Sequence, residues 1–325
     1  MCWFNKFISV VISVALVVCS VLGIVSRRYE SKTLFADDGF ENGFSVVSMD
    51  ASQGTKLLGD FTYSDNENKP SWMIAQWNSK HCLWDERIES DKYTITDGIT
   101  KSVTYNPDDK SVSMHLNAQN VYCGAPADVA SWPHLLLEQS PIDGYSEMTD
   151  GEKEFYNCSA DKMILNLDIR ISDFKDTTNP EGTNAAQFLA YFYFKGTNEQ
   201  DFVWFGVNLF DSRGLMGTYW SMDTAGSNRM IYTISTEDVY GFKSRSLFRN
   251  GKPYVSDRWT KVRLDLTPHL DALIEKINEE NLFGRHVERS DFYIGGTNIG
   301  FEILGNYDCT VDIRNFNITS YIKSI

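Results

Sequence analysis

The chain has 325 residues, of which 42% are hydrophobic and 14% aromatic, which is enough apolar material for a large folded core. This composition excludes intrinsic disorder for most of the chain. The formal net charge of −14 comes from 44 acidic against 30 basic residues, a balance that repels a phosphate backbone. No nucleic acid is expected as a partner, and neutral or positively charged partners fit better.

The N-terminal segment predicts a secretory signal or a membrane anchor. An apolar run from residue 7 to 25 follows Lys6 and precedes Arg27 and Arg28. Its length is close to the ~20 residues that span a bilayer. Ala36 offers a small residue for cleavage before "DDGFENG". We therefore expect residues 1–36 to be a signal or anchor and residues 37–325 to be one secreted or cell-surface domain, with membrane contact only through residues 7–25 if they are kept.

Four cysteines remain beyond residue 36, namely Cys82, Cys123, Cys158 and Cys309. They are too far apart in sequence for a CxxC metal or redox motif, and they leave one or two disulfides or free thiols as equal alternatives. No cofactor is expected. A structural calcium ion held by "ADDGFENG" together with Asp312 is conceivable, because calcium prefers carboxylate and carbonyl oxygen ligands.

From residue 37 onward the sequence is dominated by predicted strands separated by turn-forming clusters. Ten segments alternate in polarity or are rich in β-branched and aromatic residues. They are 71–78, 98–106, 111–119, 163–172, 186–194, 201–210, 230–235, 259–266, 294–304 and 310–318.

One segment reads as a helix, near 268–281, with Leu270, Leu273, Ile274 and Ile277 on one stripe and Gly284 close behind. No linker or repeat interrupts the pattern. The sequence therefore predicts an all-β fold, a two-sheet antiparallel β-sandwich of jelly-roll type with one short helix.

Four predicted strands carry unusual side chains on the face turned away from the core. A solvated face of a sheet usually shows Lys, Glu and Thr, whereas these faces show aromatic rings, amides, acids, Arg and Gly. The outward sets are Asn166, Asp168 and Arg170; Gln187, Leu189, Tyr191 and Tyr193; Trp204, Gly206, Asn208 and Phe210; and Asn298, Gly300 and Glu302.

Aromatic rings stack on the apolar faces of sugars, while amides, carboxylates and Arg bond to sugar hydroxyls. Glycine leaves room for a ligand to approach the sheet. A concave sheet with these groups predicts a glycan cleft. The alternative is that loops cover the rings as a second small core, and that Asp168 and Arg170 form local or cross-strand ion pairs.

The stretch "WPHLLLEQ" at 132–139 fits the same pattern. As a strand it directs Leu135 and Leu137 into the core and places Trp132, His134 and Glu138 outward. With Asp168 and Glu302, Glu138 supplies several carboxylates on faces that could meet, which acid and base catalysis of glycoside cleavage requires.

A second stretch, "FGVNLFDSRG" at 205–214, places Asp211 and Arg213 just after a strand. Its local interpretation is an Asp-initiated turn closed by Gly214. Its functional interpretation has Arg213 binding a ligand hydroxyl or carboxylate. The sequence contains no GxSxG, HExxH, P-loop or dinucleotide-binding motif.

Over residues 130–320 the chain resembles a group of bacterial secreted proteins, mostly uncharacterised, of the concanavalin A-like lectin and glucanase superfamily. The resemblance is carried by "WPHLLLEQ", "FVWFGVNLFDSRG", "RWTKVRLDLTPHLDALIEKI" and "GGTNIGFEILGNYDCTVDIRNFNI". It implies a concave sheet that holds the sugar through Trp132, Tyr191, Trp204 and Glu302. The ExDxxE strand of the laminarinase-like members is absent. "AYFYFKG" resembles the "YFKAG" strand of an alginate lyase family whose other motifs are missing.

The sequence therefore predicts an extracellular protein that binds a polysaccharide or oligosaccharide. The alternatives are a glycoside hydrolase or polysaccharide lyase acting in the same cleft, and an adhesion module that binds protein. The candidate ligand-binding residues are Trp132, Tyr191, Tyr193, Trp204, Asn208, Arg170, Gln187 and Arg213. For the enzyme alternative the candidate catalytic residues are Glu138, Glu302 and Asp168, with His134 assisting.

Overall fold

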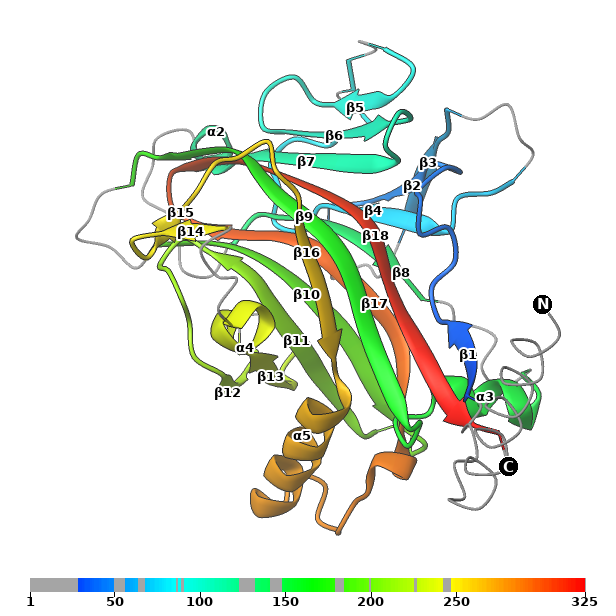
Figure 1. Ribbon diagram of the computed structural model, residues 1–325. Helices are drawn as coiled ribbons and strands as arrows, with labels where there is room; N and C mark the ends of the chain where they lie inside the picture. Colours follow the sequence, from blue (N-terminus) through cyan, green and yellow to red (C-terminus); the bar gives the residue numbers. More distant parts are fainter. Residues whose placement is uncertain are drawn as a thin grey trace, which may run out of the picture.

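The structure is a computed structural model that describes residues 29–49, 56–63, 68–85, 87–88, 91–122, 132–140, 148–178, 184–198, 200–224, 227–241 and 247–324. It is an all-β sandwich of two large sheets, as the sequence predicts. Figure 1 shows the long strands of one sheet lying across those of the other. All ten predicted strands are present, and the additional strands are short.

The strands are β1 (Tyr29–Thr33), β2 (Phe44–Val47), β3 (Leu57–Phe61), β4 (Trp72–Ala75), β5 (Thr94–Thr96), β6 (Lys101–Asn106), β7 (Ser111–Asn117), β8 (His134–Gln139), β9 (Lys162–Asp176), β10 (Ala185–Gly196), β11 (Phe202–Asp211), β12 (Tyr219–Met222), β13 (Met230–Ile234), β14 (Phe248–Arg249), β15 (Lys252–Pro253), β16 (Thr260–Asp265), β17 (Phe292–Leu304) and β18 (Tyr307–Lys323).

The two sheets differ in size. The seven-stranded sheet has the order β16-β9-β18-β7-β6-β5, with β1 also paired to β18. The nine-stranded sheet has the order β12-β13-β11-β10-β17-β8-β4-β2-β3. The predicted antiparallel arrangement holds except for β2 with β4 and β11 with β13, which are parallel. A parallel pair needs a crossover connection, and residues 212–229, which include β12, make the one between β11 and β13.

The core lies between the sheets, where the inward side chains of β9, β10, β11 and β17 form one apolar cluster. Phe35 lies at its centre, with its ring stacked on Phe192 of the nine-stranded sheet and on Phe316 of the seven-stranded sheet. It also contacts Trp72, which is fully buried. Burying these large rings supplies much of the hydrophobic stabilisation that holds the two sheets together.

The predicted domain boundary after residue 36 does not coincide with the edge of this fold. β1 pairs with β18 along its whole length, and Leu34 and Phe35 are buried in the core. Two side-chain amides then hold the backbone that follows. Asn317 exchanges two hydrogen bonds with the peptide groups of Phe35, and Gln139 exchanges two with those of Ala36. Cleavage after Ala36 would remove a strand and two core side chains. Residues 1–28 of the predicted signal or anchor lie outside the described residues.

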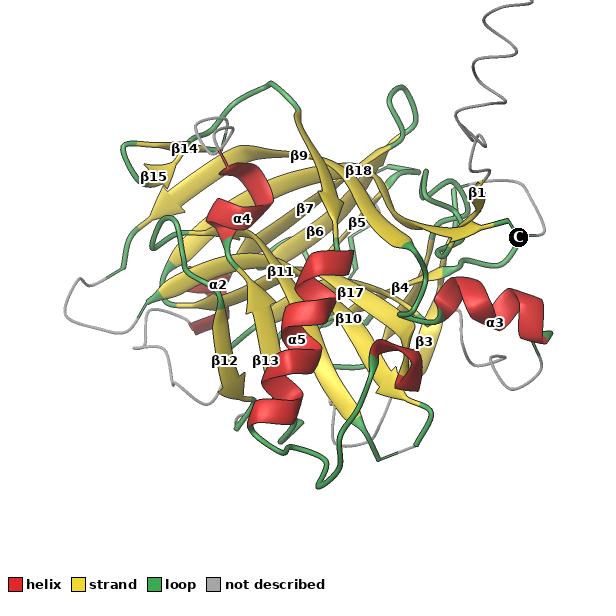
Figure 2. Cartoon of the chain, turned by 60° about the horizontal axis from the view of Figure 1, so that its bottom comes forward, coloured by secondary structure: helices red, strands yellow, loops and turns green. Residues whose placement is uncertain are grey.

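The predicted helix is α5 (Thr267–Glu279), and its Leu270, Leu273, Ile274 and Ile277 are buried as expected. Three shorter helices, α2 (Ala118–Tyr122), α3 (Asp150–Tyr156) and α4 (Thr236–Tyr240), were not predicted. Figures 1 and 2 both show α4 and α5 beside β12 and β13. These two helices therefore cover one open side of the sandwich. Among the described helices, none combines the length and apolar character that crossing a membrane requires.

The predicted alternatives for the cysteines and for calcium are answered in part. Cys82, Cys158 and Cys309 are buried free thiols, and Cys123 lies outside the described residues. Two carboxylates of the predicted calcium site, Asp37 from "ADDGFENG" and Asp312, are engaged separately. Asp37 accepts hydrogen bonds from the backbone N–H groups of Glu41 and Asn42, and Asp312 is paired with Arg170.

Candidate functional site

The outer face of the nine-stranded sheet collects most of the candidate residues, because their strands are neighbours and in register. One row runs across the sheet through Glu138 on β8, Asn298 on β17 and Tyr191 on β10. It continues through Gly206 on β11 and Thr233 on β13 to Tyr219 on the edge strand β12. Side chains two residues apart along a strand share a face, so this register places the six residues on one surface.

A second row lies four residues further along β8, β17 and β10, and five residues further along β11. It joins His134 on β8 to Glu302 on β17, Gln187 on β10 and Asp211 on β11. Gln187 donates a hydrogen bond to Asp211 at 2.9 Å. The Asp211 carboxylate, which is fully buried, also accepts two hydrogen bonds from the Arg213 guanidinium at 2.9 and 2.7 Å. The local interpretation of "FDSRG" is thus confirmed, because Arg213 is held by its own turn.

Between the rows the sheet is irregular at one point that the sequence pattern does not reveal. A bulge at Phe188 and Leu189 shifts the register, so that Phe210 pairs with Phe188. Phe210 therefore faces the core, where its ring packs against Phe174 and Phe248. Its predicted outward position is wrong, because an added residue reverses the alternation along a strand. Asn208 keeps its outward position and is almost fully buried.

The side chains of Tyr191 and Tyr219 lean toward each other over the sheet. These residues lie on strands three positions apart, about 14 Å along a flat sheet, yet their hydroxyl oxygens are 3.2 Å apart. The ring of Tyr191 reaches across Gly206, where a Cβ atom would come within 2.5 Å of it. Gly206 therefore makes room for a tyrosine ring and not for a ligand, which corrects the expectation from sequence.

The aromatic residues on this face pack mainly against one another. Trp204 meets Tyr191, Tyr193 and Phe202 edge to face, at centroid distances of 6.0, 5.0 and 4.9 Å. Tyr191 is only 6% exposed, so its ring faces are covered. Tyr193 and Trp204 are half-buried and keep accessible surface. Trp132 precedes β8, which begins at His134, so it stands at the end of the face and not within it.

The carboxyl groups of Glu138 and Glu302 on this face accept few hydrogen bonds. Burial raises the pKa of Glu138 from 4.5 to about 7, and a hydrogen bond from Trp77 only partly opposes the rise. Burial also raises the pKa of Glu302 to about 7, assisted by the negative charge of Asp223. Burial lowers the pKa of His134 to about 4, so its imidazole is neutral at pH 7. The face thus holds two carboxyls able to carry a proton near neutral pH.

Several polar atoms on this face are buried without a hydrogen-bond partner among the described residues. They are Nδ1 of His134, both amide atoms of Asn208 and Oδ1 of Asn298. Buried polar groups in folded proteins nearly always find a partner in protein, water or ligand. Four such atoms on one surface therefore mark a place where hydroxyl groups of water or of a ligand would bind.

Asp168 and Arg170 do not belong to this surface. Both lie on β9, on the outer face of the other sheet, and each forms an ion pair with the residue directly opposite on β18. Asp168 pairs with Arg314 at 3.0 Å, and Arg170 pairs with Asp312 at 2.6 Å. The predicted meeting of Asp168 with Glu138 and Glu302 is wrong, because strands that alternate alike were assigned to one sheet. The alternative of cross-strand ion pairs is confirmed.

Sequence reasoning missed three contributors to the face. Tyr219 comes from the four-residue edge strand β12, and Asp223 follows it in a turn. Asp223 accepts two hydrogen bonds from Ser227, whose hydroxyl in turn accepts one from the indole of Trp204. Trp77 follows β4. The alternation of "TYWSM" is the one sequence signal that could have indicated β12, since the approach of Asp223 and Trp77 depends on loops.

Comparisons with known proteins give similarity in shape only. No family model and no curated protein matches the sequence. A family 12 xyloglucanase from Bacillus licheniformis is 10% identical, with 75% of this chain and 94% of that chain covered and a TM-score of 0.38. An endoglucanase from Rhodothermus marinus is 11% identical, with 69% and 87% covered and a TM-score of 0.37. The xyloglucanase domain of a type three effector from Sinorhizobium fredii, in complex with cellobiose, is 9% identical, with 70% and 85% covered and a TM-score of 0.34. Similarity this weak does not bear on the site.

Proposed function

We propose that the protein binds a neutral oligosaccharide or polysaccharide on the outer face of the nine-stranded sheet. The observation that carries the proposal is the set of unpartnered polar atoms on His134, Asn208 and Asn298, all on the outer face of the nine-stranded sheet. Leaving a buried polar group unpaired costs about 1–3 kcal/mol. Ligand hydroxyls, which both donate and accept, would satisfy amide N–H, amide oxygen and imidazole nitrogen alike.

The charge of the face supports a neutral ligand. Glu138, Glu302 and Asp223 are acidic, and Arg213 is already neutralised by Asp211. An anionic chain, such as one built of uronic acids, would be repelled by these carboxyl groups. The two half-buried rings, Tyr193 and Trp204, supply apolar surface on which a sugar ring can stack. The polysaccharide lyase alternative loses support for the same electrostatic reason.

The proposal is tested by measuring retention of the full chain on a panel of neutral polysaccharides, including β-1,4- and β-1,3-glucans, mannan and xylan. Asn208→Leu removes both unpartnered amide atoms and is expected to weaken binding at least tenfold. Asn306→Ala is the matched control, because the Oδ1 atom of Asn306 is also buried and unpartnered but lies at the turn between β17 and β18. Equal retention of the wild type and Asn208→Leu on every glycan, or no retention at all, contradicts the proposal.

Glycoside cleavage on the same face is the second candidate, and one observation favours it. Glu302 is a half-buried carboxyl whose pKa is raised to about 7 beside the negative charge of Asp223, and a general acid needs such a raised pKa. Glu138 does not fit as its partner. Glu302 is opposite His134, four residues from Glu138, which separates the two backbones by about 14 Å, whereas paired catalytic carboxylates lie about 5–9.5 Å apart.

Product release from the same glycan panel separates cleavage from binding. If cleavage occurs, Glu302→Gln and Asp223→Asn are expected to abolish product while retaining the glycan, and Glu138→Gln is expected to keep most of the activity. Retention without any product in the wild type rules out the cleavage candidate and leaves the binding proposal in place.

A further inference from the structure

A second candidate site lies on the opposite side of the sandwich. The outer face of the seven-stranded sheet carries an open pocket of about 470 Å³, within the ~300–1,000 Å³ range of small-molecule sites. Its floor is a row of residues in register across five strands, namely Thr94 on β5, Thr104 on β6, Ser113 on β7, Asp312 on β18 and Arg170 on β9. This row consists of three hydroxyls followed by an ion pair.

The hydrogen-bonding capacity of this floor is only partly used. The hydroxyls of Thr94 and Thr104 are 3.1 Å apart, while the Ser113 hydroxyl has no partner among the described residues. Arg170 donates from Nε to Asp312 and from Nη1 to the carbonyl oxygen of Asp257, which leaves Nη2 without a described partner. The floor therefore offers a hydroxyl and a guanidinium N–H group to a ligand.

The ion pair at the end of the row is held rigidly. Asp312 is only 4% exposed and accepts a second hydrogen bond from Ser172. The guanidinium groups of Arg170 and Arg314 both lie over the indole ring of Trp259, each 4.4 Å from the ring centroid. A guanidinium fixed on both sides presents its free N–H groups in one direction, which favours directional bonding over loose attraction of charge.

We propose that this pocket, which we name the hydroxyl pocket, is a second binding site for a neutral polyhydroxylated ligand, the same chemical class as an oligosaccharide. Its one cation, Arg170, faces two carboxylates, Asp312 and Asp91, so an anion gains little there. Its hydroxyls match sugar hydroxyls as donors and as acceptors. The proposal rests on the chemistry of this pocket, and it extends the proposed function because the two sites lie on opposite faces of the sandwich.

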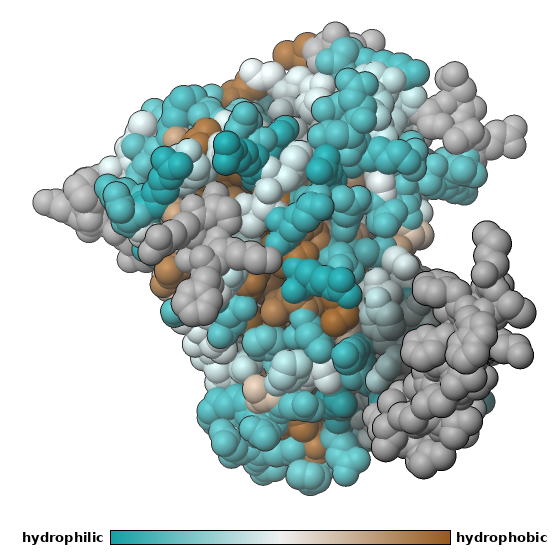
Figure 3. Space-filling view, viewed as in Figure 1, coloured by the Kyte–Doolittle hydropathy of each residue, from teal (hydrophilic) through white to brown (hydrophobic). Residues whose placement is uncertain are grey.

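Opposite placement has a consequence for the ligand. Figure 3 shows the side of the molecule that bears β9 and β18, where hydrophilic residues cover most of the surface. A ligand chain bound in the hydroxyl pocket is separated from the outer face of the nine-stranded sheet by the whole core. One molecule would therefore bind two separate glycan chains and cross-link them, instead of binding one chain at both sites.

The test is isothermal titration calorimetry of the full chain with soluble hexasaccharides of β-1,4-glucose, β-1,3-glucose, β-1,4-mannose and β-1,4-xylose. Ser113→Trp fills the floor of the hydroxyl pocket. Ser102→Trp is the matched control, because Ser102 is an outward hydroxyl on the same sheet that does not line the pocket. Arg170→Lys keeps the charge but removes the planar N–H fork, so it tests the site if Ser113→Trp fails to fold.

The expected result is two hexasaccharides per wild-type chain and per Ser102→Trp chain, one per Ser113→Trp chain, and at least tenfold weaker binding at one of two sites for Arg170→Lys. A stoichiometry that Ser113→Trp and Arg170→Lys both leave unchanged overturns the inference, and so does the absence of binding to any of the four sugars. One site lost in Ser113→Trp but kept in Asn208→Leu supports the hydroxyl pocket and contradicts the proposed function. The reverse supports the proposed function alone.

Discussion

Two groups of carboxyls in the interior of this protein have pKa values shifted in opposite directions. Burial disfavours the charged form of Asp97, but hydrogen bonds from Thr100 and the charge of Lys101 outweigh it and lower the pKa to about 2. Burial equally disfavours charge on Glu138 and Glu302, and too few donors oppose it, so both pKa values rise to about 7. The donors around each carboxyl therefore decide whether the cost of burial is overcome.

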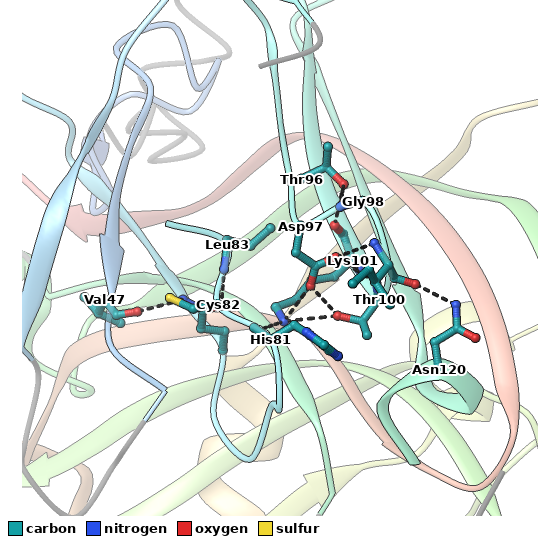
Figure 4. Close-up of polar contacts among 12 residues, drawn as sticks. Val47, His81, Cys82, Leu83, Thr96, Asp97, Gly98, Thr100, Lys101 and Asn120 are labelled. Atoms are coloured by element: carbon teal, nitrogen blue, oxygen red, sulfur yellow. Dashed lines mark hydrogen bonds and ion pairs between the residues drawn. The ribbon is translucent and has the colours of Figure 1, made fainter. Parts of the chain in front are cut away.

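The surroundings of Asp97 show what complete hydrogen bonding of a buried charge requires. Figure 4 shows Asp97, Thr100 and Lys101 directed toward one another at the turn between β5 and β6. One carboxylate oxygen accepts from the backbone N–H groups of residues 99, 100 and 101, and the other from the Thr100 hydroxyl and from Lys101 Nζ at 3.2 Å. Lys101 also donates to the carbonyl oxygen of His81. A region built for stability has its polar atoms paired, whereas the outer face of the nine-stranded sheet does not.

The largest loss of stability is expected from breaking the buried ion pair between Asp97 and Lys101. Lys101→Met leaves the Asp97 carboxylate buried without its counter-ion, and removing one partner of a buried pair costs about 3–5 kcal/mol. Urea-induced unfolding measures this loss. Lys110→Met is the control, because Lys110 pairs with Glu41 at the surface, where such a pair contributes less than about 1 kcal/mol. Equal losses in the two variants would mean that the Asp97 network does not stabilise the fold.

The next largest effect is a pH-dependent loss of stability caused by Glu138 and Glu302 on the outer face of the nine-stranded sheet. Glu138 and Glu302 hold their protons more tightly in the folded state than in the unfolded chain, where the pKa is 4.5. Their contribution to stability is therefore complete below about pH 4.5 and is lost as the pH rises toward 7. Between pH 5.5 and 8 the wild type is expected to lose about 2 kcal/mol per carboxyl relative to Glu138→Gln/Glu302→Gln.

Two other groups with shifted pKa values, His134 and Asp97, do not interfere with this pH test. His134, with its pKa lowered to about 4, contributes stability above pH 6.5 that is lost as the pH falls toward 4. Asp97 loses its contribution only as the pH falls from 3.8 toward 2. Both act on the acid side and are shared by the wild type and the double variant. Parallel curves of unfolding free energy above pH 5.5 would show that the two carboxyls titrate normally.

Sequence alone predicted the sandwich well, because alternation is a local property. The core side chains of β9, Met163, Leu165, Leu167, Ile169 and Ile171, are all buried as predicted. Alternation gives the face of a strand but not the sheet to which it belongs. Asp168 on β9 and Gln187 on β10 therefore looked equivalent, although they lie on opposite sides of the molecule. Strand pairing between distant segments decides this, and no local pattern encodes it.

The sequence predicts which residues belong to the candidate site, but it does not predict which of them contact one another. The sequence pattern places His134, Glu302 and Gln187 on outward faces, and only the register of β8, β17 and β10 shows that they form one row. Phe210 was misplaced because a one-residue bulge leaves no mark on the alternation. Residues 29–36 are included in the predicted signal or anchor because Ala36 offers a small residue for cleavage, and this local signal does not reveal that β1 pairs with β18.

A smaller loss of stability is expected where the outer face of the nine-stranded sheet is tightly packed, at Gly206. Gly206→Ala places a methyl group about 2.5 Å from the Tyr191 ring, which must move, and overpacking of this kind costs about 1–3 kcal/mol. Thermal unfolding measures the cost. Gly217→Ala is the control, since no atom lies within 4 Å of its added Cβ. A normal melting temperature for Gly206→Ala would indicate that Tyr191 is free to move and that the face is looser than its burial suggests.

The smallest effect separates a paired amide from an unpaired one. Gln76 is fully buried, donates to the carbonyl oxygen of Val47 and accepts from the N–H of Leu83, at 3.0 Å each. Gln76→Leu leaves both of these backbone groups buried without a partner. It is expected to lower the free energy of unfolding in urea by about 1–3 kcal/mol. Asn208→Leu removes two polar atoms that have no partner among the described residues, so it is expected to be neutral or to stabilise by up to about 1 kcal/mol. A loss in Asn208→Leu as large as in Gln76→Leu would mean that ordered water already satisfies the amide. In that case a ligand would have to displace that water, and the outer face of the nine-stranded sheet would gain less from binding sugar hydroxyls than its unpaired atoms indicate.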